Sequence, residues 1–345
     1  MRWATLPALP IDPPGPAAGM VSGAIRPGGG APSGPEALKW GRGNCHMGAM
    51  ASPAPSPSAD TGVAMRLSPL VTRILAPNPS PFTFEGTQSY LVGTEDVAVI
   101  DPGPADEAHL AALTAAIAGR PVRAILCTHT HRDHSPAAAP LAARTGAPVI
   151  GCAPLTLEDE GPRADAAFDP DYAPDRVLAD GETLAGVDWA LTAVATPGHT
   201  SNHLCYALES EQALFTGDHV MGWSTTVVSP PDGDMGAYLA SLDRLLARDD
   251  AVYYPAHGAP IAQPRRLVRG TLGHRRMREG QILRHLERHG PAPALIPDMV
   301  RAMYAGIDPR LHGAAGRSVL AHLIDLERRG LARPVGEGWA RIVPA

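Results

Sequence analysis

The chain has 345 residues, 44% of them hydrophobic, and carries 29 basic against 35 acidic side chains for a net charge of −6. This length and apolar content suit about two domains with cores of their own. No run of 18 apolar residues occurs, which excludes a membrane-spanning helix. The four cysteines (Cys45, Cys127, Cys152 and Cys205) contain no CxxC pair and are too few for a disulfide framework, so we expect a reducing, cytoplasmic compartment.

The first 64 residues differ in composition from the rest of the chain, because they hold 11 Pro and 11 Gly. Such a segment cannot bury enough apolar surface to offset the entropy lost on ordering, so residues 1–64 are predicted to be a disordered extension. Pro7, Pro10, Pro13 and Pro14 interrupt any apolar segment that a signal peptide would need. Met65, directly before Arg66-Leu67-Ser68, is a candidate for the true translation start.

From Met65 to Ile261, short strands alternate with helices. Residues 97–100 form a β-rich run that ends at Asp101-Pro102-Gly103, and residues 107–118 are rich in Ala and Leu, as in a helix. Residues 124–127 are the next apolar strand. This order predicts an α/β domain over residues 65–261.

Residues 262–345 change to a helical pattern. Apolar side chains at helical spacing predict a long helix over residues 265–289 and shorter ones over 298–304 and 317–329. Two strand-like runs, 331–335 and 339–343, flank Gly336-Glu337-Gly338 and predict a β-hairpin. Helices followed by a hairpin indicate a small winged-helix module, and its helical bulk also allows a homodimer.

The charge is unevenly distributed between these parts. Residues 65–261 carry a net charge of −15, whereas residues 262–345 carry +8. A basic helical module beside an acidic body suggests an anionic partner such as nucleic acid. Arginine on an exposed helix face is equally ordinary, so charge alone leaves this question open.

The densest group of chemically active side chains follows the strand at residues 124–127. The segment Thr128-His129-Thr130-His131-Arg132-Asp133-His134 offers four potential metal ligands within six residues. Open α/β sheets place binding sites at the carboxyl ends of their strands, where this segment should lie. Imidazole and carboxylate ligands suit zinc, although other divalent metals fit as well.

This HxHxDH pattern resembles the metallo-β-lactamase superfamily, which implies an αββα sandwich over about residues 66–261. Three further segments resemble the motifs that complete its metal site: 196–200 with His199, 215–218 with Asp218 and 255–258 with His257. The resemblance implies a site for two Zn²⁺ ions. The first would take His129, His131, His199 and Asp218; the second would take Asp133, His134, Asp218 and His257.

Physical chemistry agrees with this assignment. Zinc lowers the pKa of its water to about 7, so a metal-bridging hydroxide can act as nucleophile while the second metal stabilises the developing oxyanion. Asp133 is the expected catalytic proton carrier, because it would ligate only one metal beside the hydroxide. Asp101 could orient a ligand histidine, or be an ordinary turn residue. His203 could contact substrate at the mouth of the site, or be a packed surface histidine. His219 is expected to be structural.

A finer resemblance, to the β-lactamase-like-protein-2 branch, extends over about residues 66–345. It is carried by residues 78–83, 86–93, 217–223, 230–235 and 317–323. Because animal relatives are endoribonucleases, it implies cleavage of single-stranded RNA. The basic residues of the last domain could then bind phosphates; they include Arg317, Arg328, Arg329, Arg333 and Arg341. The acidic body and the low aromatic content count against RNA.

The sequence leaves two functions other than RNA cleavage open. The first is hydrolysis of a small-molecule ester, thioester or lactone, as in the glyoxalase II and lactonase branches, which share the seven ligands. Glyoxalase II itself is disfavoured, because residues 262–345 contain no Lys and only one Tyr, Tyr304. The second is a non-catalytic nucleic-acid-binding module, which the complete ligand set argues against, since structural zinc sites are closed and four-coordinate.

Overall fold

The computed structural model describes residues 58, 60–155, 168–306 and 312–342 of the chain. The predicted disorder of residues 1–64 therefore concerns a segment that lies almost wholly outside the described residues. Within the described ranges the elements follow in the order β1(Met65–Arg66), β2(Val71–Leu75), β3(Gln88–Val92), β4(Val97–Ile100), α1(Glu107–Ile117), β5(Val122–Cys127), α2(Ala138–Thr145), β6(Val149–Gly151), β7(Arg176–Val177), β8(Thr183–Ala185), β9(Ala190–Ala195), β10(Leu204–Leu208), η1(Glu209–Glu211), β11(Ala213–Gly217), α3(Met235–Leu246), β12(Val252–Pro255), α4(Pro264–His289), α5(Ile296–Met303), α6(His312–Arg328), β13(Ala332–Val335) and β14(Gly338–Arg341).

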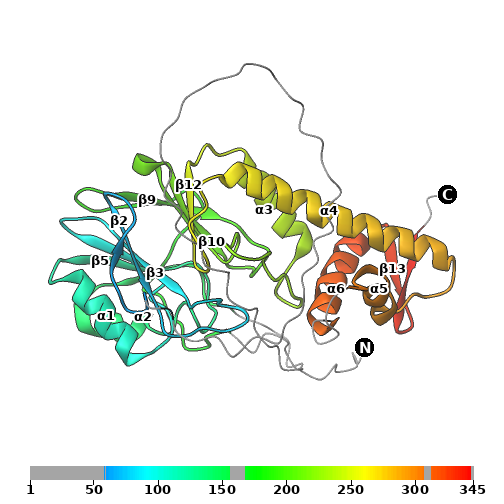
Figure 1. Cartoon of the computed structure of the whole chain (residues 1–345), viewed down its shortest axis with the longest axis horizontal. Helices are drawn as coiled ribbons and strands as arrows, with labels where there is room; N and C mark the ends of the chain where they lie inside the picture. Colours follow the sequence, from blue (N-terminus) through cyan, green and yellow to red (C-terminus); the bar gives the residue numbers. More distant parts are fainter. Residues whose placement is uncertain (1–57, 59, 156–167, 307–311, 343–345) are drawn as a thin grey trace, which may run out of the picture.

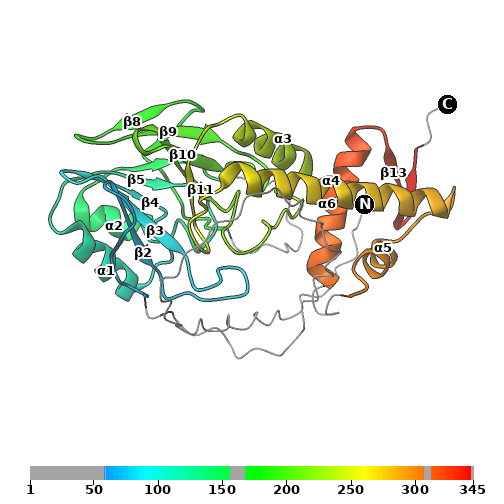
Figure 2. The same ribbon diagram turned by 45° about the horizontal axis from the view of Figure 1, so that its top comes forward.

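Two sheets form the centre of the first domain (Figures 1 and 2). The larger sheet has seven strands in sequence order from β1 to β7, antiparallel up to β4 and parallel from β4 to β7. The smaller has the order β12-β11-β10-β9-β8, and within it only the β11–β12 pair is parallel. Helices α1 and α2 cover the outer face of the larger sheet and α3 that of the smaller (Figure 2). The predicted αββα sandwich is confirmed.

Large aromatic rings fill the space between the two sheets. The ring of Tyr90 on β3 lies 5.1 Å from that of Phe215 on β11 and 5.8 Å from that of Tyr254 on β12. All four residues of β4 and all five of β3 are buried, because helices cover one face of their sheet and the second sheet covers the other. This explains why the sequence of β4 is apolar without alternation. The core therefore fixes how the two sheets face each other.

The folded part of the chain begins before Met65. Thr61 forms a bridge to Leu75 of β2, and the amide of Gly62 donates a hydrogen bond to the Leu75 carbonyl at 2.9 Å. Asp60 pairs with Arg73 at 3.3 Å. The first domain thus extends to about residue 60, several residues beyond the boundary expected from composition.

The C-terminal part consists of α4, α5, α6 and the β13–β14 hairpin, which matches the helices and hairpin expected from the sequence. Its core gathers Ile282 and Leu286 of α4 with Val300, Val319 and Trp339. The first half of α4 packs elsewhere: Val268 and Leu272 join the cluster around α3. Figure 1 shows α4 running from one domain to the other, so the two share a helix that joins their cores.

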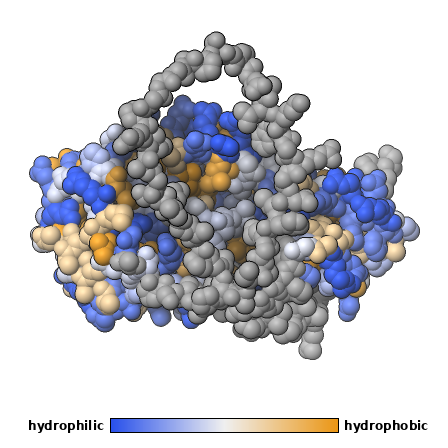
Figure 3. All heavy atoms as spheres, in the orientation of Figure 1, coloured by the Kyte–Doolittle hydropathy of each residue, from blue (hydrophilic) through white to orange (hydrophobic). Residues whose placement is uncertain are grey.

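The surface of this C-terminal part is mostly hydrophilic in the view of Figure 3. None of the described helices is long and apolar enough to cross a membrane. Cys127, Cys152 and Cys205 are buried and unpaired.

Candidate metal centre

The seven predicted ligands come together although they are spread over 129 positions of the chain. Each follows the carboxyl end of a strand. His129, His131, Asp133 and His134 come after β5, His199 after β9, Asp218 after β11 and His257 after β12. These strands belong to both sheets, so the site lies where the ends of the two sheets meet.

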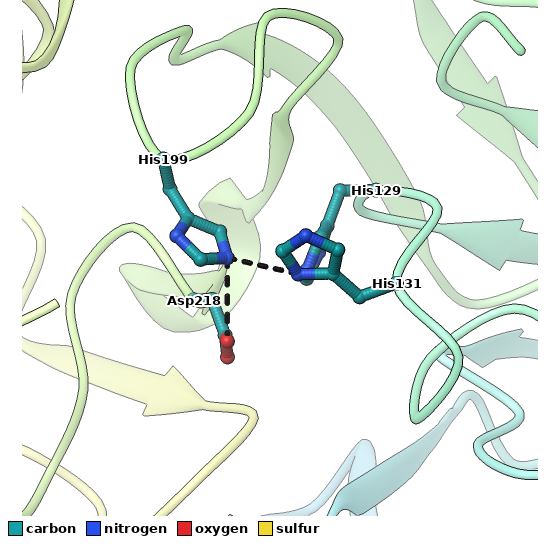
Figure 4. A group of neighbouring side chains, drawn as sticks. All are labelled: His129, His131, His199 and Asp218. Carbon is teal, nitrogen blue, oxygen red and sulfur yellow. Dashed lines mark hydrogen bonds and ion pairs between the residues drawn. The ribbon is translucent and has the colours of Figure 1, made fainter. Parts of the chain in front are cut away.

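His129, His131, His199 and Asp218 form a first group, and Figure 4 shows their side chains pointing toward one another. Nδ1 of His131 lies 2.9 Å from Nε2 of His129 and 3.1 Å from Nε2 of His199. Oδ2 of Asp218 lies 3.5 Å from the same His199 nitrogen. Three imidazole nitrogens and one carboxylate oxygen thus face a common point.

Asp133, His134 and His257 form a second group. Oδ2 of Asp133 lies 3.3 Å from Nε2 of His134 and 3.2 Å from Nε2 of His257. The other oxygen of Asp218, Oδ1, lies 3.6 Å and 3.2 Å from the same two nitrogens. Asp218 therefore stands between the groups, with Oδ2 toward the first and Oδ1 toward the second.

The donor atoms fit metal ions. Nε2 of His134 and Oδ1 of Asp218 are buried and have no hydrogen-bond partner within the described part of the chain, and buried polar atoms are seldom left without one. Burial, together with the neighbouring His199, lowers the pKa of His131 to about 3, which keeps this ring neutral and able to ligate. Burial opposes the charge on His257, but Asp218 and Asp133 raise its pKa to about 10, so these carboxylates strongly favour a cation beside them.

Hydrogen bonds fix the orientation of the histidine rings through their other nitrogens. Nδ1 of His199 lies 2.6 Å from the Val227 carbonyl, and Nδ1 of His257 lies 3.2 Å from the Gly86 carbonyl. Nδ1 of His129 lies 3.0 Å from Oγ1 of Thr128. In each case the ring donates from Nδ1, which leaves Nε2 free to bind a metal.

Asp101 occupies the position expected of a residue that orients a ligand. Its Oδ2 lies 3.1 Å from Nδ1 of His134, and its two oxygens accept hydrogen bonds from the amide and hydroxyl of Thr128 at 2.7 and 2.8 Å. Its backbone φ is +47°, a conformation that costs energy for a residue other than glycine. Strain of this kind persists where the surroundings demand it, here next to the motif.

His203 lies neither at the mouth of the site nor on the surface, which corrects both sequence-based expectations for it. The residue is 1% exposed. Its Nε2 accepts a hydrogen bond from the Asp218 amide at 3.3 Å, and its Nδ1 lies 2.9 Å from Oγ1 of Thr196. His203 thus lies behind the ligands, where it cannot touch substrate. His219 is also fully buried, against the ring of Tyr238.

Several residues at the site had no role assigned from the sequence. Thr87 donates a hydrogen bond from Oγ1 to Asp133 at 3.4 Å, and Asn78 holds Thr87 through two hydrogen bonds of 2.9 Å. Both residues lie in the segments 78–83 and 86–93 that carry the finer resemblance. Only this resemblance could have pointed to them from the sequence. The Gly86 and Val227 carbonyls left no signal, because a backbone acceptor is independent of residue type.

Comparison with known proteins agrees with this geometry. Residues 82–257 match the family model described as the metallo-beta-lactamase superfamily, and residues 296–339 match the beta-lactamase associated winged helix domain. The match to the winged helix domain confirms the winged-helix prediction. The region matched by the metallo-beta-lactamase model contains all seven candidate ligands.

Individual proteins are similar over most of the same region. An atrochrysone carboxyl ACP thioesterase of Paecilomyces divaricatus is 33% identical over 65% of this chain and 66% of its own length. The lactamase-like protein adaB of Aspergillus niger is 33% identical over 71% of this chain and 76% of its own. A metallo-beta-lactamase family protein of Thermus thermophilus, of known structure, is 25% identical with a TM-score of 0.63, covering 80% of this chain and all of that one.

Proposed function

Because this chain belongs to the metallo-beta-lactamase superfamily and is a metal-dependent hydrolase, we propose that it holds two zinc ions and hydrolyses a thioester. The observation that carries the two-metal proposal is the position of Asp218. Each of its oxygens faces a different group of histidines, as a carboxylate shared by two cations would. Bound metal ions would supply a water of lowered pKa and polarise the substrate carbonyl.

The first metal would be held by His129, His131, His199 and Asp218, and the second by Asp133, His134, Asp218 and His257. We assign proton transfer to Asp133 because of its exposure. Its side chain is 26% exposed, against 12% for Asp218 and 8% for His199, so it borders the space that water and substrate enter. Thr87, His134 and His257 contact its Oδ2, and no residue in the described ranges forms a hydrogen bond or ion pair with its Oδ1. That oxygen can accept a proton and pass it to the leaving sulfur.

Two observations support a thioester with an apolar acyl group. A relative 33% identical is named an acyl-carrier-protein (ACP) thioesterase. Exposed apolar side chains are also present: Val227, whose carbonyl accepts a hydrogen bond from His199, is 39% exposed, and Phe82, in the segment that leads to Thr87, is 50% exposed. Phe84, close to Phe82 in sequence, stacks on Trp223 with ring centroids 5.1 Å apart. Such side chains can stabilise an acyl chain by burying apolar surface.

RNA, the substrate implied by the finer resemblance, is less well supported. Of the five arginines expected to bind phosphates, Arg328 pairs with Asp234 and Arg329 pairs with Glu279 and Asp325. These ion pairs lower the charge available to a phosphate backbone. We therefore place RNA second to a thioester.

The proposal is tested by offering zinc-loaded protein acetyl and decanoyl thioesters of N-acetylcysteamine, a lactone and end-labelled single-stranded RNA. We expect thioester hydrolysis, faster for decanoyl than for acetyl, and a loss of at least a hundredfold in kcat for Asp133→Ala. Asp249→Ala is the matched control, because Asp249 pairs with Arg265 on the surface and is 84% exposed. RNA cleavage without thioester hydrolysis would refute the substrate proposal, and equal rates for Asp133→Ala and the control would refute the role of Asp133.

A further inference from the structure

Arg275 of α4 is a buried cation with unusual surroundings. It is 4% exposed, and within the described ranges no carboxylate lies in ion-pair distance of it. Its Nη2 donates to the Thr226 carbonyl at 2.5 Å, its Nη1 lies 3.3 Å from Oγ of Ser318, and its Cζ lies 5.5 Å from the centre of the Tyr238 ring. Burying an unpaired charge costs stability, which hydrogen bonds to the guanidinium offset only in part. A residue of this kind is therefore expected to have a role other than stability.

The acceptor that Arg275 holds belongs to the segment that orients the first group of ligands. Oγ1 of Thr226 donates to the carbonyl of Asp218 at 2.8 Å. The next residue, Val227, offers its carbonyl to Nδ1 of His199 at 2.6 Å. One guanidinium of α4 thus holds the peptide group that joins Thr226 to Val227. The Thr226 hydroxyl on one side of this peptide contacts Asp218, and the Val227 carbonyl on the other side contacts His199.

A second connection reaches the same histidine from α6. Arg328 pairs with Asp234, the residue that caps the N-terminus of α3 through a 2.9 Å hydrogen bond from the Ala237 amide. The amide of Asp234 donates to the carbonyl of Gly198 at 2.9 Å. Gly198 directly precedes His199, and any Cβ there would stand 2.3 Å from Cα of Tyr238, so α3 packs tightly on this turn.

We infer that Arg275 is a positioning residue for the first metal, and that the C-terminal domain completes the metal centre by holding residues 226–227 from outside. This inference rests on the proposed two-metal function. The second group should depend on Arg275 much less. Asp101 and the Gly86 carbonyl, which orient His134 and His257, belong to the N-terminal half, and only Asp218 is common to both groups.

The test compares Arg275→Met with Arg276→Met, using Co²⁺ as the probe in metal-free full-length protein. Arg276 is the matched control, because it neighbours Arg275, is 63% exposed in its side chain and pairs with Asp243 on the surface. His131→Ala and His257→Ala assign the visible Co²⁺ absorption bands to the first and second groups. Loss of a residue that orients metal ligands typically lowers affinity about 10- to 100-fold. We expect this loss for the band assigned to the first group in Arg275→Met, with partial recovery in Arg275→Lys.

The outcomes are separable. Fewer than two bound Co²⁺ per wild-type chain would refute the proposed two-metal centre itself. Two ions in the wild type and equal affinities in Arg275→Met and Arg276→Met would overturn the role of Arg275. An equal loss at both groups, together with a lower melting temperature, would show a merely structural role and overturn it as well. If Arg275→Met does not fold, Thr226→Val removes the hydroxyl bound to Asp218, and unchanged Co²⁺ affinity in that variant overturns the inference.

Discussion

Replacing Asp101 by Asn tests how the second metal group is oriented, because the change keeps the side chain's shape but removes its negative charge and replaces one acceptor oxygen by a donor. Three donors converge on the Asp101 carboxylate: the Thr128 amide on Oδ1, and the Thr128 hydroxyl and His134 Nδ1 on Oδ2. An asparagine offers one oxygen and one NH₂ group. If the NH₂ takes the Oδ1 position, it faces a backbone amide that can only donate. If it takes the Oδ2 position, it faces Nδ1 of His134.

The second orientation is the less costly, because imidazole can change its tautomer and a backbone amide cannot. The proton of His134 then moves to Nε2, the atom that faces Asp133 and Asp218. Metal binding requires this proton to leave Nε2 again. The hydrogen bond from Nε2 to a carboxylate is then lost, at a cost of about 1.5–3 kcal/mol. At about 1.4 kcal/mol per tenfold change, the second metal should bind about 10- to 100-fold more weakly.

The assay is a Co²⁺ titration of metal-free Asp101→Asn against wild type, followed by its absorption spectrum. We expect the first-group band to be retained and the second-group band to require more metal. Asp106→Asn is a suitable control, since Asp106 caps helix α1 and is not within the two ligand groups. Equal affinity of the second group in Asp101→Asn and wild type would refute the reasoning from tautomers.

Three further predictions concern other parts of the molecule. Chelation of the metals should lower the melting temperature, because ions bound only by the folded state stabilise it; calorimetry that shows no decrease would contradict this. Trp223→Ala should raise KM for a decanoyl thioester far more than for an acetyl one, since Trp223, which stacks on Phe84, lies against Gly258, the residue after the ligand His257; equal increases would contradict an apolar acyl site. Burial lowers the pKa of His109 from 6.5 to about 4, although the nearby Asp106 carboxylate acts to raise it. The contribution of this pKa shift to the free energy of unfolding is therefore complete above pH 6.5 and disappears as the pH falls to 4. In urea unfolding of metal-free protein, the free energy of unfolding of His109→Gln should therefore fall by about 3 kcal/mol less than that of wild type between pH 7 and 4. Parallel pH profiles for the two proteins would contradict this prediction.

Four of the candidate ligands were predictable from the residues alone, because ligation needs particular side chains at short spacing. His199, Asp218 and His257 were expected only from the resemblance to the metallo-β-lactamase superfamily. His129, His131, Asp133 and His134 lie in one turn after β5, and the type of each limits what it can do. His203 was misplaced for the opposite reason. It directly precedes β10, the central strand of the smaller sheet, whose five residues are all buried. Burial at that point depends on α3 and on strands far along the chain, which local sequence does not specify.

The residues that support the ligands were less accessible to sequence reasoning. The Val227 and Gly86 carbonyls act through the backbone, so their residue types carry no signal. Arg275 is one of 15 basic residues after position 261, and nothing in its local pattern separates it from the exposed arginines of the same helix. Its role depends on the packing of α4 against α3, which brings residue 275 to the segment after Asp218.

The connection between Asp218 and α3 explains why a hydrolase of this kind would need its C-terminal domain. Residues 218–234 form no helix or strand, yet they carry one ligand and the acceptor for another. An irregular segment of this length is costly to hold in one conformation without contacts from outside. The first domain supplies the Gly198 carbonyl, which accepts a hydrogen bond from the Asp234 amide, and the C-terminal domain supplies Arg275 and Arg328. Since ligands must be held to a few tenths of an ångström for catalysis, this division of contacts predicts that weakening the domain interface lowers the affinity for the first metal before the fold is lost.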